Sequence, residues 1–167
     1  MGILLIESSS EKIEFGYAVE QEIIINEKLD INCNADTLTY FLKRSFENNN
    51  IKFGEIEFVS LSNGPGSFTG LRIGSAIAKG ICFTTGSKLI EISTLDIIAG
   101  KYKSKKNIIS LVTSNSRLSE FYYCEYSVND DKVKRISEYK IDCAEKIFKQ
   151  DFIYLINEDL KIEISPE

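Results

Sequence analysis

The chain has 167 residues, of which 20 are basic and 25 acidic, so its net charge at neutral pH is −5. This length suits one large domain or two small lobes, and a hydrophobic fraction of 43% is ordinary for a folded globular protein. The absence of histidine excludes Ser-His-Asp and Cys-His nucleophilic pairs and histidine metal sites, and the acidic balance argues against a protein that grips RNA by itself.

The first half of the chain shows three strand patterns followed by alternating helix and strand patterns. A continuous apolar run at residues 3–7 predicts a central strand, and alternation at residues 12–20 predicts its neighbour. Asp36 is expected to cap a helix with apolar residues at three- and four-residue spacing. The remaining predicted elements of this half are strands at 23–25, 56–61 and 88–92 and helices at 67–84 and 95–102.

This order of elements is the layout of one lobe of the ribonuclease H-like fold of actin, Hsp70 and sugar kinases. After a basic segment at residues 101–106, which we interpret as a solvated joint, a shorter version of the pattern begins. Its predicted elements are strands at 107–112, 120–127, 132–139 and 152–156 and a helix at 143–150. We therefore predict an α/β protein with an N-terminal lobe at 1–103 and a reduced C-terminal lobe at 104–167.

The cysteines and the apolar segments indicate a reducing compartment. The four cysteines lie far apart, which favours reduced, mostly buried side chains over a disulfide framework or a zinc site. They are Cys33, Cys82, Cys124 and Cys143. The opening residues lack the features of a signal peptide, and no apolar stretch approaches the ~20 residues that a membrane helix needs. We expect a cytoplasmic protein that does not enter a membrane.

A glycine-rich loop between a predicted strand and a predicted helix is the most distinctive motif. Ser67 can cap the helix, and the first N–H groups beyond it have the geometry that holds a phosphate. The loop lacks the Gly-Lys-Ser/Thr ending of a Walker A loop and misses the Rossmann glycine spacing by one residue. We therefore favour a structural turn, which lets helix and sheet approach closely, over a phosphate site.

The helix after this loop carries a stripe of small residues at four-residue spacing. The stripe consists of Gly66, Gly70, Gly74, Ala78 and Cys82, with Arg72 and Lys79 at the charged edge of the helix. A helix that lies on one sheet needs a single apolar stripe, and this helix has enough apolar surface for two contacts. Two explanations are open, because either a second lobe or helix covers the extra face or a partner protein does.

The loop resembles the signature of the TsaB family. Its residues are Asn63, Gly64, Pro65, Gly66, Ser67, Phe68, Thr69, Gly70, Leu71, Arg72, Ile73 and Gly74. The resemblance continues through Ala76, residues 78–80 and the Ser-Thr-Leu triplet at 93–95. Residues 3–9 are similar to the family's opening strand and turn, and residues 117–122 to its Arg-x-x-Glu-x-Tyr segment.

The resemblance implies a non-catalytic scaffold subunit. Proteins of this family bind and activate TsaD, which holds a metal through histidines and transfers threonylcarbamoyl to the adenosine beside the anticodon of ANN-decoding tRNAs. The ATPase TsaE takes part, tRNA is contacted only indirectly, and the same helices support homodimers. The resemblance implies no catalytic, metal or intrinsic cofactor residue, and a nucleotide only at the junction with TsaD.

The resemblance also places the association surface on the two helices at residues 36–48 and 67–84. The contact residues that it implies are Leu38, Phe41, Leu42, Ser45, Ser67, Gly70, Leu71, Gly74, Ser75, Ala78 and Cys82. Glu7 and Asn115 stand where the family usually has Asp, which makes ATP hydrolysis less favourable. The alternative function is a small nucleotide-binding ATPase or kinase-like enzyme of the actin-like superfold that uses Glu7 and the loop amides. Relatives have also been labelled peptidases, but this sequence has no histidine and no other activated nucleophile that a peptidase would need.

Overall fold

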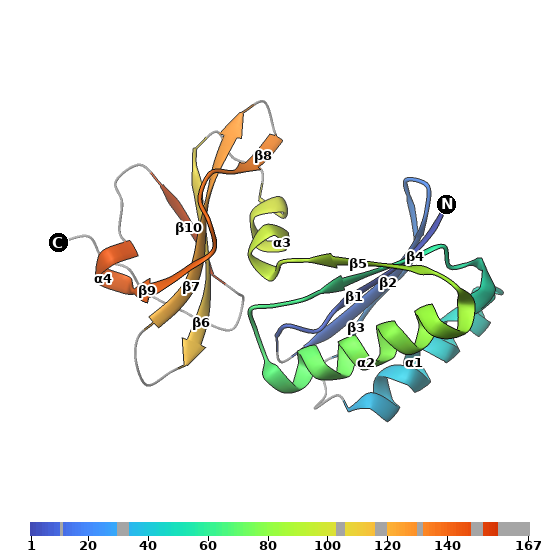
Figure 1. The fold of residues 1–167 in the computed structure, drawn as a ribbon. Coiled ribbons are helices and arrows are strands. Elements are labelled where there is room, and N and C mark those ends of the chain that lie inside the picture. The colour runs from blue at the N-terminus through green and yellow to red at the C-terminus, as the bar shows by residue number, and fades with distance from the viewer. Residues whose placement is uncertain are drawn as a thin grey trace. The chain divides into compact units, whose positions relative to one another are not determined.

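The computed structural model describes residues 1–10, 12–29, 34–102, 106–115, 120–129, 132–147 and 152–156, with the side chain of Asn115 excluded. The chain forms two compact units, Met1–Thr94 (unit 1) and Leu95–Glu167 (unit 2), which we describe separately (Figure 1). The units divide earlier than the lobe boundary expected after residue 103. The reason is that Leu95 and Ala99 are buried in a core of unit 2.

Unit 1 is built on a five-stranded sheet in the order β3-β2-β1-β4-β5 (Figure 1). The strands are β1 (Gly2–Glu7), β2 (Ile13–Val19), β3 (Glu22–Leu29), β4 (Phe58–Ser62) and β5 (Lys88–Ile92). The first three are antiparallel, and β4 and β5 run parallel to β1. Helices α1 (Ala35–Asn48) and α2 (Phe68–Thr85) make the two crossovers that parallel strands require. The ribonuclease H-like fold is thereby confirmed.

The core of unit 1 lies between this sheet and the two helices. Alternate strand residues such as Leu4 and Ile6 face the helices, and Leu38 and Leu42 of α1 meet them, all with exposures of 3% or less. The Phe46 ring packs against Tyr17, with 5.1 Å between ring centroids. Burial of each such side chain contributes about 1.5–3 kcal/mol, so this layer holds both helices in place.

Three sequence predictions in unit 1 need correction. Helix α1 is capped by Asn34 rather than Asp36, because the Asn34 side chain accepts a hydrogen bond from the Thr37 amide at 2.8 Å. Strand β3 extends well beyond residues 23–25, and β4 begins at Phe58 rather than at residue 56. The segment before β4 contains a short 3₁₀ helix, η1 (Phe53–Glu55), which the sequence pattern did not predict.

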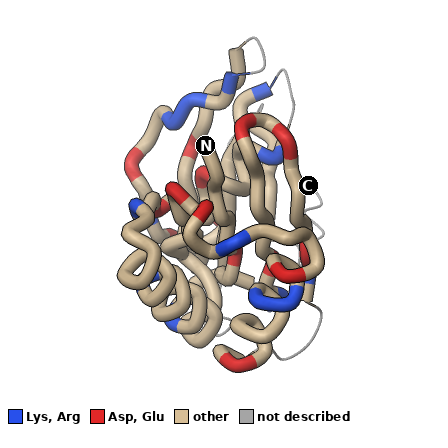
Figure 2. Tube along the Cα trace, turned by 90° about the vertical axis from the view of Figure 1, so that its right-hand side faces the viewer, with Lys and Arg blue, Asp and Glu red and all other residues tan. Residues whose placement is uncertain are grey.

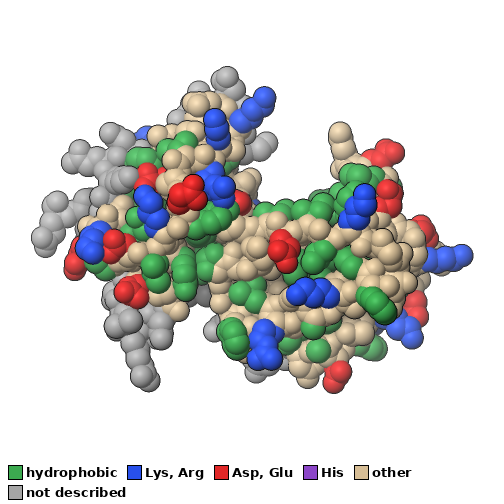
Figure 3. Space-filling view, in the orientation of Figure 1, with side chains coloured by type: hydrophobic (Ala, Val, Ile, Leu, Met, Phe, Trp, Pro, Cys, Tyr) green, Lys and Arg blue, Asp and Glu red, His purple; other side chains and the backbone are tan. Residues whose placement is uncertain are grey.

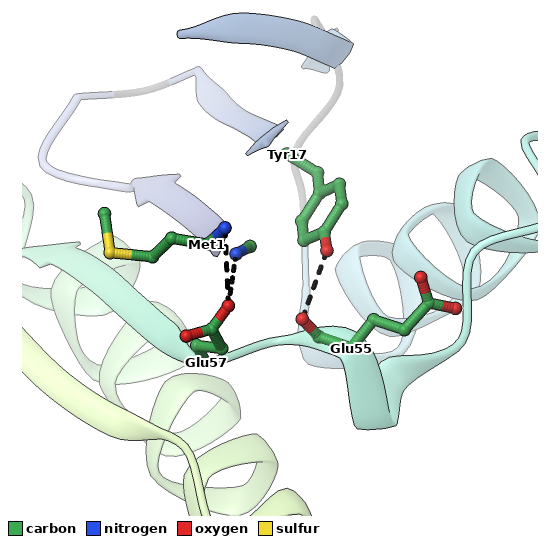
Figure 4. A network of polar contacts seen from close by, with 5 residues as sticks. Met1, Tyr17, Glu55 and Glu57 are labelled. Atoms are coloured by element: carbon green, nitrogen blue, oxygen red, sulfur yellow. Dashed lines mark hydrogen bonds and ion pairs between the residues drawn. The ribbon is translucent and has the colours of Figure 1, made fainter. Parts of the chain in front are cut away.

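The start of β1 is anchored to the segment that precedes β4 (Figure 4). The Met1 ammonium lies 3.5 Å from Glu57 Oε1, and the Gly2 amide donates to the same oxygen at 3.1 Å. The Tyr17 hydroxyl donates to the Glu55 carbonyl at 3.2 Å. Burial, and next the charges of Glu55 and Glu57, raise the pKa of Tyr17, so this hydroxyl stays a hydrogen-bond donor.

Unit 2 repeats the strand arrangement around β1 in shorter form. Its sheet has the order β10-β6-β7-β8, and β9 also pairs with β7. The elements are α3 (Thr94–Gly100), β6 (Ile108–Asn115), β7 (Glu120–Asn129), β8 (Lys132–Arg135), β9 (Lys140–Cys143), α4 (Ala144–Ile147) and β10 (Ile153–Ile156). Strand β6 takes the place of β1. It pairs in parallel with β10, as β1 does with β4, and antiparallel with β7, as β1 does with β2.

The sheet of unit 2 has a core on each face. Ile108 and Val112 of β6 pack on the side of Leu95 from α3, whereas Ile109 and Leu111 pack on the side of Ile147 from α4. This alternation follows from the two-residue period of a strand. The single strand predicted at 132–139 is wrong, because β8 ends at Arg135 and pairing with β7 resumes only in β9. Of the helix predicted at 143–150, positions 148–150 lie outside the described residues.

The helices and cysteines can be described for most of the chain. None of the described helices is long and apolar enough to cross a bilayer. Cys82, Cys124 and Cys143 are free thiols, and burial raises the pKa of Cys82. Cys33 lies outside the described residues.

Candidate functional site

The signature loop ties the end of β4 to the end of β5. The Asn63 amide donates to the Ile92 carbonyl at 3.0 Å, and the Gly64 carbonyl accepts from the Thr94 amide at 2.9 Å and from Ser93 Oγ at 3.3 Å. Gly64 has a φ of +97°, a backbone conformation that residues other than glycine rarely adopt. The first part of the motif therefore serves a structural turn.

The second part of the loop starts α2 and holds the turn between β1 and β2. Ser67 caps the helix as predicted, since its Oγ accepts from the Gly70 amide at 3.3 Å. The Ser67 amide donates to the Ser9 carbonyl at 2.6 Å. Because these two amides are bonded within unit 1, they are not available to a phosphate, which favours the structural interpretation of the loop.

Gly70 and Gly74 of α2 are buried against this turn. A Cβ atom added to Gly66 or Gly70 would lie 2.2 Å from the carbonyl oxygen of Ser9 or Ser8, and one added to Gly74 would lie 2.2 Å from Ser8 Oγ. No side chain larger than hydrogen fits so close to the backbone oxygens that face Gly66 and Gly70. At these three glycines, helix and turn therefore approach each other closely.

Glu7 supports the same turn from inside. Its Oε1 accepts from the Ser9 amide at 2.7 Å and from Ser9 Oγ at 2.5 Å. Glu7 Oε2, Ser8 Oγ and Thr94 Oγ1 are buried and have no hydrogen-bond partner among the described residues. No group of three or more acidic or cysteine side chains within the described ranges could hold a metal ion. The Asn115 side chain and the arginine at 117 lie outside those ranges.

The contact residues implied by the resemblance fall into two groups. The buried group consists of Leu38, Leu42, Ser45, Gly70, Gly74 and Ala78. The partly exposed group consists of Phe41, Ser67, Leu71, Ser75 and Cys82. The first group packs inside unit 1 and shapes the helices, so only the second group has surface for another molecule.

A different face of α2 is open to solvent, and we call it the exposed stripe. It consists of Phe68, Arg72, Ala76, Lys79 and Phe83, which recur at spacings of four, four, three and four residues. Phe68 is 74% and Phe83 91% exposed, and the Arg72 guanidinium lies over the Phe68 ring, 5.3 Å from its centroid. Figure 3 shows hydrophobic and basic side chains along α2 on this face. The sequence prediction placed none of these five residues on a contact surface, although their spacing marks them as one helix face.

An open groove of about 510 Å³ runs beside the exposed stripe within unit 1. It is lined by Leu61, Ser62, Asn63, Phe68, Leu71, Arg72, Ser75, Ala76, Lys79 and Glu91. These residues come from the end of β4, the signature loop, α2 and β5. Tyr40 of α1 is a further exposed aromatic side chain of unit 1, with 58% exposure.

The charge of α2 differs from that of the whole chain. The sequence of α2 contains Arg72 and Lys79 but no acidic residue, while the whole chain has five more acidic than basic residues. Neither side chain forms an ion pair with the described residues. Elsewhere Lys and Arg are interspersed with Asp and Glu (Figure 2). The exposed stripe is thus locally cationic on an acidic protein.

Comparison with known proteins identifies the family. The family model described as TsaD, tRNA N6-adenosine threonylcarbamoyltransferase, matches residues 34–164. The tRNA threonylcarbamoyladenosine biosynthesis protein TsaB of Buchnera aphidicola subsp. Acyrthosiphon pisum is 30% identical over 158 residues, which cover 90% of this chain and 68% of that protein. The chain belongs to the TsaB family. It is therefore a member of a family of tRNA threonylcarbamoyladenosine biosynthesis.

Two further comparisons set the extent of the likeness to TsaB proteins. TsaB of Buchnera aphidicola subsp. Schizaphis graminum is 32% identical over 109 residues, covering 61% of this chain and 50% of that protein. The structure of YeaZ from Pseudomonas aeruginosa superposes with a TM-score of 0.79 at 16% identity, covering 92% of this chain and 75% of that one. The chain thus spans about half to two thirds of the length of these curated TsaB relatives.

Proposed function

We propose that this chain is a non-catalytic subunit that binds TsaD and activates threonylcarbamoyl transfer to the adenosine beside the anticodon of ANN-decoding tRNAs. The observation that carries the proposal is the exposed stripe of α2 on a member of the TsaB family. Two phenylalanine rings that are 74% and 91% exposed on one helix form the kind of apolar surface that a partner protein covers.

The proposed contact is the face made by the exposed stripe, Tyr40 and the partly exposed residues Phe41, Leu71 and Ser75. Burial of a phenylalanine side chain contributes about 1.5–3 kcal/mol, so Phe68 and Phe83 are the expected anchors. Arg72, over the Phe68 ring, shields one side of that ring and leaves its other side for the partner. The buried residues of α1 and α2 then act by holding this face in position.

The available side chains support a role other than catalysis. The sequence has no histidine with which to reproduce a histidine-bound metal of the TsaD kind. Glu7 is the candidate catalytic group of the alternative ATPase or kinase function. Its Oε1 already accepts hydrogen bonds from the amide and the hydroxyl of Ser9. We extend the proposal to a cytoplasmic complex in which TsaE takes part, tRNA touches this chain only indirectly, and any nucleotide lies at the junction with TsaD.

Reconstitution tests the proposed function. The purified chain is mixed with TsaD, TsaE, ATP, tRNA and a source of threonylcarbamoyl-adenylate, and modified adenosine is measured. We expect no product and no ATP hydrolysis from the chain alone, and product from the full mixture only when the chain is present. ATP turnover by the chain alone would instead support the alternative enzyme.

Matched variants test the proposed surface. The double variant Phe68→Ala/Phe83→Ala should lose co-purification with TsaD and product formation while its thermal unfolding changes little, because both rings are exposed. Ile136→Ala/Ile141→Ala, which removes two exposed apolar side chains of unit 2, is the control and should retain both properties. Equal complex formation by the two variants would place the TsaD contact elsewhere.

A further inference from the structure

We infer that Asn63, the first residue of the signature loop, is a site of spontaneous deamidation through a succinimide ring formed with the Gly64 amide. Asn63 is the one asparagine of the sequence that glycine follows. A side chain on the following residue hinders attack by its backbone nitrogen, and glycine has none. This modification is separate from the proposed function and requires no enzyme.

The side chain of Asn63 is accessible to the reaction. Asn63 is exposed, and it lines the open groove beside α2. Its side-chain amide forms no hydrogen bond with the described residues. The Cγ carbon, at which the ring closes, is therefore attached to a group that can turn without losing a protein contact.

The peptide group between Asn63 and Gly64 is free, although the residues are tied down on either side of it. The Asn63 amide donates to the Ile92 carbonyl at 3.0 Å. The Gly64 carbonyl accepts from the Thr94 amide at 2.9 Å and from Ser93 Oγ at 3.3 Å. The Asn63 carbonyl and the Gly64 amide have no hydrogen bond among the described residues. The main chain is thus bonded outside this peptide group and unbonded within it.

Ring closure turns this same peptide group. The five ring atoms include the Gly64 nitrogen and the Cα, Cβ and Cγ atoms of Asn63, so rotation about the Cα–C′ bond of Asn63 brings nitrogen and Cγ together. A matching rotation about φ of Gly64 leaves the rest of the chain in place, and glycine permits it. Gly64 is buried, and a buried N–H usually has an acceptor, so an amide without one gives up no hydrogen bond when it reacts.

The reaction balances with water alone. The Gly64 nitrogen attacks Cγ of Asn63, its proton passes to solvent base, and the side-chain nitrogen leaves as ammonia. Water then opens the ring at either carbonyl and leaves aspartate or isoaspartate at position 63. Both products place a negative charge on the groove that Arg72 and Lys79 also line. Isoaspartate also adds a methylene to the main chain between the bonds to Ile92 and Thr94, which loosens the turn.

Mass spectrometry of fragments from the aged full chain tests this inference. The purified protein is incubated at neutral and at alkaline pH, and each fragment is examined for replacement of an amide by a carboxyl group. Asn26 and Asn107, which Glu27 and Ile108 follow, are internal controls. We expect conversion at Asn63 to be at least about tenfold faster than at either control, and to accelerate with pH because the amide proton must leave.

The products distinguish the ring from direct hydrolysis of the side chain. Opening of a succinimide yields isoaspartate as well as aspartate, and a protein isoaspartyl methyltransferase labels the former. Asn63→Gln retains an exposed amide but does not form the five-membered ring, so its fragment should remain unmodified and unlabelled. The inference is overturned if Asn63 reacts no faster than Asn26, if aspartate is the sole product, or if Asn63→Gln is modified at the wild-type rate.

Discussion

The Tyr126 hydroxyl donates a hydrogen bond to Asp96 Oδ1 at 2.7 Å, and the other oxygen of the same carboxylate accepts from the Tyr139 hydroxyl at 2.6 Å. Asp96 lies in the first turn of α3 and Tyr126 on β7, so this carboxylate joins the helix to the sheet of unit 2. The Arg135 guanidinium lies over the Tyr139 ring, 4.5 Å from its centroid. The arrangement makes Asp96 the polar anchor of α3.

We predict that Asp96→Ala destabilises the protein by about 1–3 kcal/mol, because the Tyr126 hydroxyl, on a side chain only 2% exposed, is left without its acceptor. Denaturant unfolding measures this loss. Tyr126→Phe, made in the Asp96→Ala background, should cost little more, since the unpaired hydroxyl is then gone. Strictly additive losses in this double-mutant cycle would contradict the direct contact.

Alkaline pH should destabilise the protein through the same tyrosine. Burial and, next, the hydrogen bond to Asp96 raise the pKa of Tyr126 above its ordinary value of 10.0. The folded state therefore keeps the proton while the unfolded chain loses it, so the stabilisation is complete below about pH 10 and declines above it. Unfolding free energies measured from pH 8 to 11 should fall at the alkaline end less steeply for Tyr126→Phe. Equal slopes for the two proteins would refute this assignment.

Two glycines of α2 should respond in opposite directions to the same substitution. Gly70→Ala places a Cβ 2.2 Å from the Ser8 carbonyl oxygen, so helix and turn must separate and we expect a loss of about 1–3 kcal/mol. At Gly80 nothing lies within 4 Å of the added Cβ, so Gly80→Ala should stabilise the helix by about 0.5–1 kcal/mol. Thermal unfolding of the two variants measures the difference. If Gly70→Ala proves neutral, the close approach of α2 to the turn is wrong.

The two faces of α1 should separate stability from association. Leu42 is 2% exposed, and Leu42→Ala should cost about 2–5 kcal/mol in denaturant unfolding because it leaves a cavity in the core. Tyr40 is 58% exposed, so Tyr40→Ala should change stability by less than about 0.5 kcal/mol while it weakens binding to TsaD. A large stability loss for Tyr40→Ala would show that its ring packs within unit 1.

Much of the fold could be predicted from local pattern. The apolar run of β1, the alternation of β2 and the Ser67 cap of α2 each depend on residues close together in the chain, and all three predictions were confirmed. The N-cap of α1 was missed because Asn34 and Asp36 are both good capping residues. The strand predicted at 132–139 was too long, and β9 was missed because its four residues are recognisable as a strand only through their pairing with β7.

The sequence by itself determined the loop motif, the family resemblance and the helical period of α2, because each is a matter of residue order and spacing. Only the tertiary structure decided which face of α2 is free. Glycines at four-residue spacing permit close approach equally to another protein or to the chain's own backbone, and the choice depends on Ser8 and Ser9, more than fifty residues earlier in the chain. Once these residues pack against the small-residue stripe, the opposite face, from Phe68 to Phe83, is the one left exposed.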